Sequence, residues 1–341
     1  MHGMQHNVDL TKYNTFAFKA VAERFVRIAA IEQVPLVCEY CRENGLPLLL
    51  LGGGSNLVLG ERLPGVVAQI ALTGWRAVQG ADGKVDIAVG AGELWQDIVE
   101  RAMCAGYYGL ENMALIPGTV GAAPVQNIGA YGAELKDHVS CVEVYDRETC
   151  RFGRLTNAEC AFGYRDSIFK SKCPDRYIIT AVHFALATTP QVHIAYAALQ
   201  QKCEHLAGEG DITPHIVYEA VCQLRQQKLP DPEVLGSAGS FFKNPVISAT
   251  QYEQLKSEFP NLSAYPDAHG YKLAAGWLIE QCGWKGRRQE NVGVYEKQAL
   301  VLVNYGGGDR SQIVRLAGAI QESVYNRFGV RLEPEPRFYP R

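Results

Sequence analysis

Residues 116–132 read Ile116-Pro117-Gly118-Thr119-Val120-Gly121-Ala122-Ala123-Pro124-Val125-Gln126-Asn127-Ile128-Gly129-Ala130-Tyr131-Gly132. They lie within 112–133, the longest uncharged stretch of the chain, which is long enough to cross a bilayer. Its prolines, amides and glycines argue against a membrane helix, and a surface loop of this length would normally carry charge. The segment therefore either lies flat against a large planar ligand, to which it offers backbone hydrogen bonds, or forms a buried irregular segment.

A second glycine-rich segment, Gly52-Gly53-Gly54-Ser55-Asn56, joins two short apolar runs at 48–51 and 57–59. Consecutive glycines let backbone N–H groups approach an anion closely, and Ser55 and Asn56 add donors. The segment matches neither the G-x-G-x-x-G pattern nor a P-loop, so it is a phosphate cradle or a plain tight turn. Two such segments in one half of the chain favour a dinucleotide with both a ring system and a pyrophosphate.

Composition excludes several classes of protein. The 341 residues are 47% hydrophobic and 20% charged, which is typical of a globular protein, and the net charge of -3 argues against a polybasic nucleic-acid-binding protein. The ten cysteines are too few for a disulfide scaffold, and no secretion signal precedes them, so we expect reduced thiols and a cytoplasmic protein. The eight histidines form no metal-binding pattern. Cys38 and Cys41 have redox or metal spacing but fall within a predicted helix, where packing as small apolar side chains is the simpler interpretation.

Apolar periodicity and helix-end residues predict the elements. Thr213 and Pro214 mark the start of one helix, and two prolines at 230 and 232 mark the clearest linker. Another helix carries a stripe of Leu94, Ile98, Val99, Ala102 and Met103 and ends at Gly106. We expect further helices at 33–44, 214–227, 273–282 and 311–328, and strands at 48–51, 57–59, 85–89, 141–145, 177–186 and 299–304.

Three further segments carry charged or hydroxyl groups among aromatic residues or prolines. They are Phe-Gly-Tyr-Arg-Asp-Ser at 162–167, Ala-Gly-Ser-Phe-Phe-Lys-Asn-Pro at 238–245 and Leu-Glu-Pro-Glu at 332–335. Aromatic surroundings exclude water and strengthen the pairing of an arginine with an anion. Each segment alone is compatible with a purely structural role.

In order and spacing, these motifs resemble the UDP-N-acetylenolpyruvoylglucosamine reductase family, also called UDP-N-acetylmuramate dehydrogenase. The resemblance begins at Asn14-Thr15-Phe16 and spans nearly the whole chain. It implies an α+β protein with a vanillyl-alcohol-oxidase-type FAD-binding fold of two subdomains, 1–70 and 71–228, and a C-terminal α+β substrate-binding domain, 229–341. NADPH would reduce non-covalently bound FAD, which would then reduce the enolpyruvyl ether of a UDP-sugar. This step belongs to peptidoglycan precursor synthesis, on which cell shape and division depend.

The resemblance also implies site residues. Arg165 would bind the substrate carboxylate, Ser240 would donate the proton to carbon, and Glu335 would hold or polarise the same carboxylate. Tyr196 resembles the substrate-covering tyrosine of type I members, Lys228 would assist Ser240, and Asn244 and Gln298 would contact substrate. The predicted FAD contacts are Gly52, Gly53, Gly54, Ser55, Asn56, Pro117, Gly118, Thr119, Gly121, Ala122, Gln126, Asn127, Gly129, Ala130, Tyr131, Arg225 and Arg337.

The chain departs from the family pattern at two places. Ala122 and Ala123 stand where some members carry serines, so a side-chain hydroxyl to the FAD phosphates is lost there while the backbone donors are unaffected, and a longer C-terminal tail is missing. Two other functions remain open: another flavin oxidoreductase of the same fold, which would need no proton-donating serine, and a nucleotide-sugar-binding protein that keeps FAD as structure. We expect a small-molecule UDP-sugar as partner, with no nucleic acid, no membrane insertion and no obligate protein partner.

Overall fold

The structure is a computed structural model and describes residues 3–80 and 83–340. The chain forms two compact units, each built from separate stretches of sequence. Unit 1 comprises residues 1–8, 22–53 and 64–226, and unit 2 comprises residues 9–21, 54–63 and 227–341. The three-part division at residues 70 and 228 stays a prediction.

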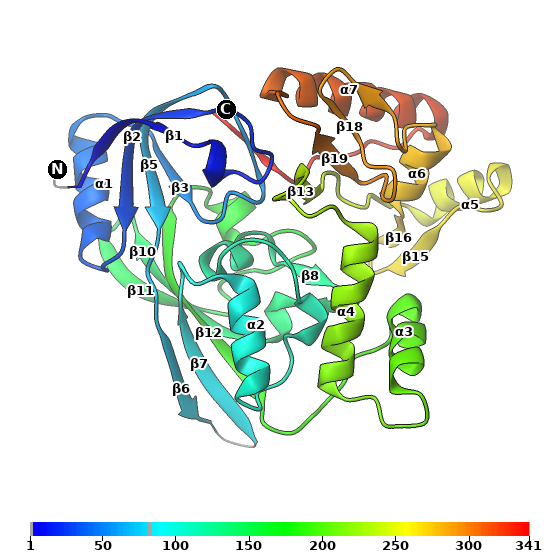
Figure 1. Cartoon of the computed structure of the whole chain (residues 1–341), viewed down its shortest axis with the longest axis horizontal. Coiled ribbons are helices and arrows are strands. Elements are labelled where there is room, and N and C mark those ends of the chain that lie inside the picture. Colours follow the sequence, from blue (N-terminus) through cyan, green and yellow to red (C-terminus); the bar gives the residue numbers. More distant parts are fainter. Residues whose placement is uncertain (1–2, 81–82, 341) are drawn as a thin grey trace. The chain divides into compact units, whose positions relative to one another are not determined.

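Unit 1 contains a four-stranded sheet ordered β1 (Gln5–Asp9), β2 (Val21–Ile28), β5 (Arg62–Ile70) and β3 (Leu48–Leu51), in which β3 and β5 are parallel. Helix α1 (Gln33–Glu43) lies beside this sheet (Figure 1). Val34, Val37 and Cys41 of α1 are buried in one core with the sheet. The predicted helix and strand are confirmed, and Gly45 follows the helix with a φ of 62°.

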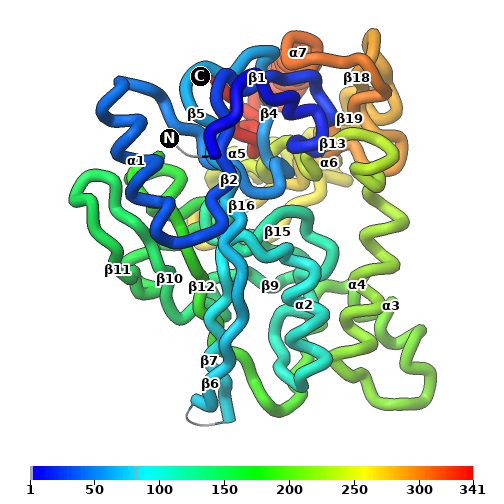
Figure 2. The backbone as a smooth tube through the Cα atoms, turned by 60° about the vertical axis from the view of Figure 1, so that its left-hand side comes forward, coloured from blue at the N-terminus to red at the C-terminus, as the bar shows by residue number. Residues whose placement is uncertain are grey.

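The second sheet of unit 1 is antiparallel and ordered β11 (Arg151–Thr156), β10 (Val139–Asp146), β12 (Tyr177–Ala187), β7 (Lys84–Gly90) and β6 (Trp75–Gln79). Strands β6 and β7 run side by side (Figure 2). The helices are α2 (Trp95–Cys104), α3 (Ala197–Ala207) and α4 (Pro214–Lys228). The backbone N–H of Ile216 donates to Thr213 Oγ1 at 3.3 Å, which confirms the predicted start of α4.

The prediction that Leu94 belongs to the buried stripe of α2 is wrong. Leu94 precedes the helix and is 52% exposed, whereas Trp95 is buried and donates from Nε1 to the carbonyl oxygen of Met113. The stripe is therefore completed by the first helical residue, whose indole both packs in the core and finds a hydrogen-bond acceptor.

The uncharged stretch, residues 112–133, forms mostly irregular structure in unit 1. It contains the 3-10 helix η3 (Val120–Gln126) and the strand β8 (Gly129–Ala130), and its two ends lie in the 3-10 helix η2 (Glu111–Met113) and in β9 (Ala133–Glu134), which pairs with β8. Ten of its 22 residues are buried and nine are half-buried, whereas Pro117, Ala122 and Gly132 are exposed. The remaining short helices of the chain are η1 (Thr11–Tyr13), η4 (Leu135–Asp137) and η5 (Ile168–Lys172).

Unit 2 is built on a four-stranded antiparallel sheet ordered β13 (Gly236–Ser240), β19 (Val301–Asn304), β18 (Val292–Val294) and β17 (Arg288–Gln289). A three-stranded sheet, β14 (Val246–Ile247), β16 (Gly270–Leu273) and β15 (Ala264–Asp267), and a parallel pair, β4 (Leu57–Leu59) and β20 (Arg337–Tyr339), complete its strands. Its helices are α5 (Ala249–Glu258), α6 (Ala275–Gln281) and α7 (Arg310–Phe328).

The ends of these elements follow local chemistry. Asp309 caps α7 by accepting a hydrogen bond from the N–H of Gln312, and Gly329 ends it in the left-handed region, as predicted. The predicted helix at 273–282 and strand at 299–304 exist, but each begins two residues late, at Ala275 and Val301. The early segment 9–21 joins unit 2 because Asn304 Nδ2 donates to the carbonyl oxygen of Phe16 at 2.7 Å.

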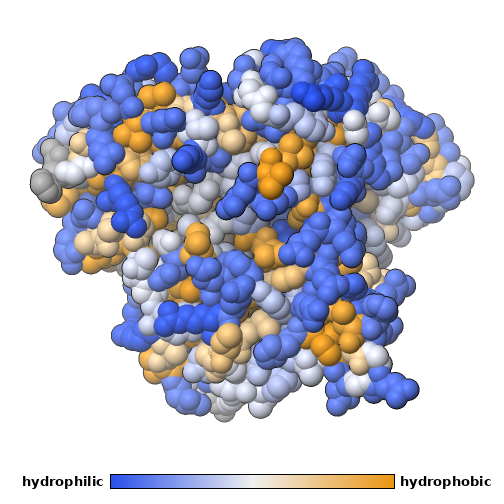
Figure 3. All heavy atoms as spheres, in the orientation of Figure 1, coloured by the Kyte–Doolittle hydropathy of each residue, from blue (hydrophilic) through white to orange (hydrophobic). Residues whose placement is uncertain are grey.

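Apolar side chains on the face shown in Figure 3 form small separate groups among hydrophilic ones. Within residues 3–80 and 83–340, no helix combines the length and the apolar character that a membrane span requires.

Candidate active site

In unit 1 the two glycine-rich segments lie against each other. A Cβ atom on Gly53 would lie 3.0 Å from Gly118 Cα, and one on Gly52 would lie 2.5 Å from Thr119 Oγ1. Glycine at position 53 therefore allows close backbone approach, whereas glycine at position 52 leaves room for the Thr119 side chain. Among the residues that the structure describes, the N–H groups of Gly53 and Gly118 donate no hydrogen bond. This pair of segments thus offers closely spaced backbone donors of the kind that cradle a phosphate.

The backbone N–H groups of the next turn are not available in this way. Val120 donates to the carbonyl oxygen of Glu93, Gly121 to that of Ala91 and Ala122 to that of Thr119, at 2.8 to 3.0 Å. The 3-10 turn and the neighbouring strand end use these three donors. Gly121 instead permits close packing, since a Cβ there would lie 2.6 Å from Ala91 Cβ.

Asn127 acts within the loop itself. Its side chain is fully buried, Nδ2 donates to the carbonyl oxygen of Gly163 at 3.0 Å, and Oδ1 accepts from the N–H of Lys136 at 2.9 Å. Its φ is 45°, and the φ of Tyr131 is 49°. These values lie in the left-handed region, which costs free energy for residues other than glycine. The surrounding hydrogen bonds hold Asn127 and Tyr131 in this conformation. The backbone N–H of Asn127 also donates, to the carbonyl oxygen of Pro124 at 3.3 Å, so the bonds of Asn127 order the loop itself.

Arg165 lies at the tip of a tight turn in the same unit. The N–H of Gly163 donates to the carbonyl oxygen of Asp166 at 3.0 Å, and Arg165 itself has a φ of 53°. Its Nη2 donates to the carbonyl oxygen of Gly129 at 2.8 Å, and its guanidinium lies 5.6 Å from the centre of the Tyr164 ring. The turn thus sets Arg165 beside the predicted flavin segment, residues 116–132, through its bond to Gly129.

A second arginine, Arg225 of α4, stands close enough to Arg165 for their charges to interact. Burial, with a smaller contribution from Arg165, lowers the pKa of Arg225. Its Nε is buried without a hydrogen-bond partner, and among the described residues Arg225 forms no ion pair. Two nearby guanidinium groups with a buried unused donor fit an anionic ligand, because a bound anion would satisfy the donor and offset the repulsion.

Tyr196, predicted to cover the substrate, precedes α3 and is 41% exposed. Its ring meets that of Tyr131 edge-on, with centroids 5.5 Å apart. The structure therefore brings together, within unit 1, the predicted flavin segment, Arg165, Arg225 and Tyr196. The nearness of Arg225 to Arg165 has no signal in the sequence, and Asn112, which contacts the Tyr131 segment, begins the uncharged stretch but was not singled out.

In unit 2 the backbones of Ser240 and Glu335 are neighbours. Ser240 pairs with Val301 at the end of β13, and the N–H of Glu335 donates to the carbonyl oxygen of Phe241 at 2.8 Å. Glu335 is 8% exposed and Ser240 is half-buried. Gly239, with a φ of 66°, makes the bend that precedes Ser240. A hydroxyl and a buried carboxyl thus lie on adjacent chain segments that are far apart in sequence.

The second half of the glycine loop belongs to this unit. A Cβ on Gly54 would lie 2.0 Å from the carbonyl oxygen of Tyr13, so only glycine fits. Ser55 follows it, and Asn56 is fixed to the chain end: its carbonyl oxygen accepts from the N–H of Arg337 at 3.0 Å, and its Nδ2 donates to the carbonyl oxygen of Glu335 at 3.4 Å. These bonds order the loop that carries the predicted cofactor donors.

Asn244 and Gln298 both contact the start of α6. Asn244 Oδ1 accepts from the N–H of Ala275 at 2.9 Å, and a Cβ on Gly276 would lie 3.0 Å from Gln298 Oε1. Their carboxamide oxygens serve the fold, so the amide nitrogens are the donors each could offer a ligand. Lys228 is the last residue of α4, and its role beside Ser240 stays a prediction.

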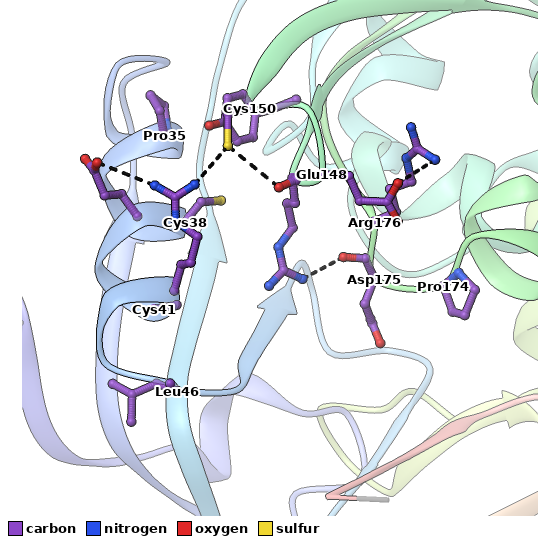
Figure 4. Close-up of a pocket in the computed structure, with 14 residues that line it drawn as sticks. Pro35, Cys38, Cys41, Leu46, Glu148, Cys150, Pro174, Asp175 and Arg176 are labelled. Atoms are coloured by element: carbon purple, nitrogen blue, oxygen red, sulfur yellow. Dashed lines mark hydrogen bonds and ion pairs between the residues drawn. The ribbon is translucent and has the colours of Figure 1, made fainter.

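A pocket of about 570 Å³ lies elsewhere in unit 1, between α1 and the turn from β10 to β11 (Figure 4). It is lined by Cys38, Cys41 and Cys150 and by none of the predicted site residues. Burial raises the pKa of Cys38 to about 11, which favours the protonated thiol, and Cys41 packs in the core as expected. Among the described residues, no group of histidine, cysteine and acidic side chains suits a metal ion.

The glycine cradle and the buried, unused arginine donor fit the diphosphate of a flavin nucleotide, and comparisons with known proteins agree. An FAD binding domain profile matches residues 22–150. The fold is shared with 6-hydroxy-D-nicotine oxidase from Arthrobacter nicotinovorans, with a TM-score of 0.53 and 12% identity over 97% of this chain and 87% of that one. The protein is therefore an FAD-dependent oxidoreductase with a vanillyl-alcohol-oxidase-type fold.

The C-terminal part is more specific, because residues 231–339 match the profile of the UDP-N-acetylenolpyruvoylglucosamine reductase C-terminal domain. The chain belongs to the UDP-N-acetylenolpyruvoylglucosamine reductase family. It is 45% identical to the Pseudomonas putida reductase over 98% of both chains, and 48% identical to that of Polynucleobacter asymbioticus over 98% of this chain and 96% of the relative. The reductase structure from Thermus caldophilus superposes with a TM-score of 0.69 and 26% identity, covering 99% and 100% of the two chains.

Proposed function

We propose that this protein catalyses the NADPH-dependent, FAD-mediated reduction of UDP-N-acetylenolpyruvoylglucosamine to UDP-N-acetylmuramate in the cytoplasm. The proposal rests on family membership and on one observation in particular: Ser240 and the buried Glu335 lie on neighbouring chain segments of unit 2, which the bond from the Glu335 N–H to the carbonyl oxygen of Phe241 joins. An oxidase that shares the flavin-binding fold has no need of a proton-donating hydroxyl beside a carboxyl.

Bound FAD supplies hydride transfer between NADPH and the substrate. Arg165 binds the carboxylate of the enolpyruvyl group with its planar fork, and it does so best where that group gains negative charge. The turn at 163–166 fixes the orientation of this arginine in advance, so little reorganisation is needed during the reaction.

Addition of hydride to the terminal carbon leaves negative charge on the neighbouring carbon, which must take a proton. Ser240 Oγ donates this proton, and Lys228 helps because a serine hydroxyl is a weak acid. Glu335 holds the substrate carboxylate, which requires Glu335 to be protonated or well paired, since two bare carboxylates repel. Tyr196, Asn244 and Gln298 contact the UDP-sugar.

An anaerobic flavin assay tests the proposal. NADPH should bleach the yellow absorbance of the purified protein, and the enolpyruvyl UDP-sugar should restore it under argon. Recovery only after oxygen is admitted would indicate an oxidase of the same fold. Failure of NADPH to bleach the flavin would indicate a protein that retains FAD for structure alone.

A further inference from the structure

Asn112 joins two segments that are distant in sequence. It lies in η2 and is 3% exposed. Its Nδ2 donates to the carbonyl oxygen of Tyr131 at 3.1 Å and to that of His193 at 2.7 Å. Both protons of a single buried amide are therefore used to connect the predicted flavin segment with residues 189–196.

Residues 189–196 form a connection without helix or strand between β12 and α3 (Figure 1). They contact the flavin segment at two further points. A Cβ on Gly132 would lie 3.1 Å from His193 Nε2, and the Tyr196 ring meets the Tyr131 ring edge-on at 5.5 Å. Ile194 of the connection also packs against the core of unit 1, and the bond from Asn112 to the His193 carbonyl is a short polar contact beside it.

Hydrogen bonds fix the residues on either side of Asn112 in η2. Trp95 Nε1 of α2 donates to the carbonyl oxygen of Met113 at 2.9 Å, and the Glu111 carboxylate accepts the N–H of Gly109 at 2.8 and 3.0 Å. Trp95 and Met113 are fully buried. The neighbours of Asn112 are therefore fixed to the core, so its amide points at the two carbonyl groups in advance of any ligand.

We propose that Asn112 is a positioning residue that fixes residues 189–196, and with them Tyr196, against the flavin segment. The role in catalysis rests on the function proposed above, because Tyr196 is there assigned to the UDP-sugar. Asn112 touches neither substrate nor flavin in this assignment. It acts by keeping the Tyr196 ring on the Tyr131 ring, which removes a conformational cost from substrate binding.

The first test needs no substrate. In the full-length FAD-loaded protein, Asn112→Leu removes both donors with little change in side-chain size. Limited proteolysis within residues 189–196 should become at least about tenfold faster, because an exposed connection is cleaved more readily once the contacts that fix it are lost. Cleavage of that segment at the parental rate would overturn the proposal, whatever reaction the protein catalyses.

Asn157 supplies a matched control in the same unit. Its Nδ2 also bridges two backbone carbonyl oxygens, those of Lys136 at 2.7 Å and Val139 at 2.8 Å, but it contacts neither Tyr131 nor residues 189–196. Asn157→Leu should leave the rate of cleavage within 189–196 and the KM for the UDP-sugar as in the parent. If Asn157→Leu reproduced the effects of Asn112→Leu, those effects would be general destabilisation and the proposal would be wrong.

Kinetics then test the link to Tyr196. Asn112→Leu should raise the KM for the enolpyruvyl UDP-sugar about 10- to 100-fold, the range expected when a buried hydrogen-bonding partner is lost, while flavin reduction by NADPH changes less than about twofold. In a Tyr196→Ala background the same substitution should raise KM far less, because coupled residues are not additive. A full, additive effect in that background would refute action through Tyr196.

A milder variant guards against misfolding. Asn112→Asp keeps the shape of the side chain but, when ionised, turns oxygen atoms toward two carbonyl oxygens. Protonation restores one donor, so the ratio of variant to parent KM should fall as the pH is lowered. A ratio that does not vary with pH would contradict the assignment of the amide protons as the connecting groups.

Discussion

Replacing Ser240 with alanine separates the structural from the chemical role of this residue. Ser240 ends β13, and the next two side chains, Phe241 and Phe242, are buried and pack with ring centroids 5.1 Å apart. The substitution removes one half-buried oxygen and leaves these rings and the bend at Gly239 intact. The loss in unfolding free energy should therefore stay within about 1 kcal/mol, the typical net contribution of a hydrogen bond.

The expected chemical effect is larger. General acid catalysis is typically worth ~10²–10⁴-fold, which is about 3–5 kcal/mol of activation free energy. FAD content and flavin bleaching by NADPH should be close to parental in Ser240→Ala, because neither step moves this proton. Flavin reoxidation by the enolpyruvyl UDP-sugar should slow by that factor, and Ser240→Cys, a stronger acid of similar size, should recover part of the rate.

Anaerobic stopped-flow absorbance of the flavin measures each half-reaction separately. Ser237→Ala is the matched control, because Ser237 belongs to the same strand, pairs with Val303 and has no assigned role in the reaction. It should reoxidise at the parental rate. If Ser240→Ala also reoxidises within a few-fold of the parent, the proton comes from another group and the mechanism must be reassigned.

Four further outcomes are expected. FAD should leave the protein on acid precipitation, because residues 52–56 and 116–132 contain no histidine or cysteine for a covalent link; yellow colour in the pellet would contradict this. Arg165→Lys should block flavin reoxidation by substrate but spare reduction by NADPH, since an ammonium lacks the planar fork; equal damage to both steps in stopped-flow traces would mean a structural role. Arg225→Met should raise the unfolding free energy of the flavin-free protein by about 1–3 kcal/mol and weaken FAD binding, because it removes a buried, unused charged donor. An unfolding free energy in urea that does not rise, or an unchanged FAD affinity in a flavin titration, would contradict this. The hydrogen bond from Arg176 lowers the pKa of Asp146 to about 2, so the ionised carboxylate stabilises the fold fully above about pH 4, and this contribution is lost as the pH falls toward 2. Asp146→Asn should therefore make the unfolding free energy, measured in urea titrations, depend less on pH between about 4 and 2. An unchanged pH dependence would refute the pairing.

The sequence predicted best the features that depend on neighbouring residues. The cap at Thr213 and the glycine at 329 mark helix ends because capping is chemistry within one turn. The prediction that Leu94 belongs to the buried stripe of α2 was wrong because an apolar residue just before a helix fits the periodicity without facing the core. Only the position of the first helical turn decides whether Leu94 or Trp95 is buried. The late starts of α6 and β19 have the same origin, since apolar runs extend past the hydrogen-bonded ladder.

Site geometry was harder to predict because it depends on pairs distant in sequence. The order of motifs indicated a flavin site, but nothing local shows that the N–H of Ala122 would be used by the turn at Thr119. Composition likewise cannot show that Arg225 would be left with a buried, unused Nε, or that Asn112 would bridge two carbonyl groups. Ser240 and Glu335 were paired through family resemblance alone, and the structure supplies the bond at Phe241 that makes them neighbours.

The discontinuity of unit 2 has a consequence for how the chain matures. Asn56 bonds to the carbonyl oxygen of Glu335 across 279 residues, and Asn304 bonds to that of Phe16 across 288. During synthesis, residues 9–21 and 54–63 emerge long before these C-terminal partners. Until then, the core that buries Phe16, Phe18 and Val58 in the folded protein cannot form. The nascent chain therefore exposes apolar side chains for most of its translation, so we expect it to depend on molecular chaperones more than a continuous domain of equal size would.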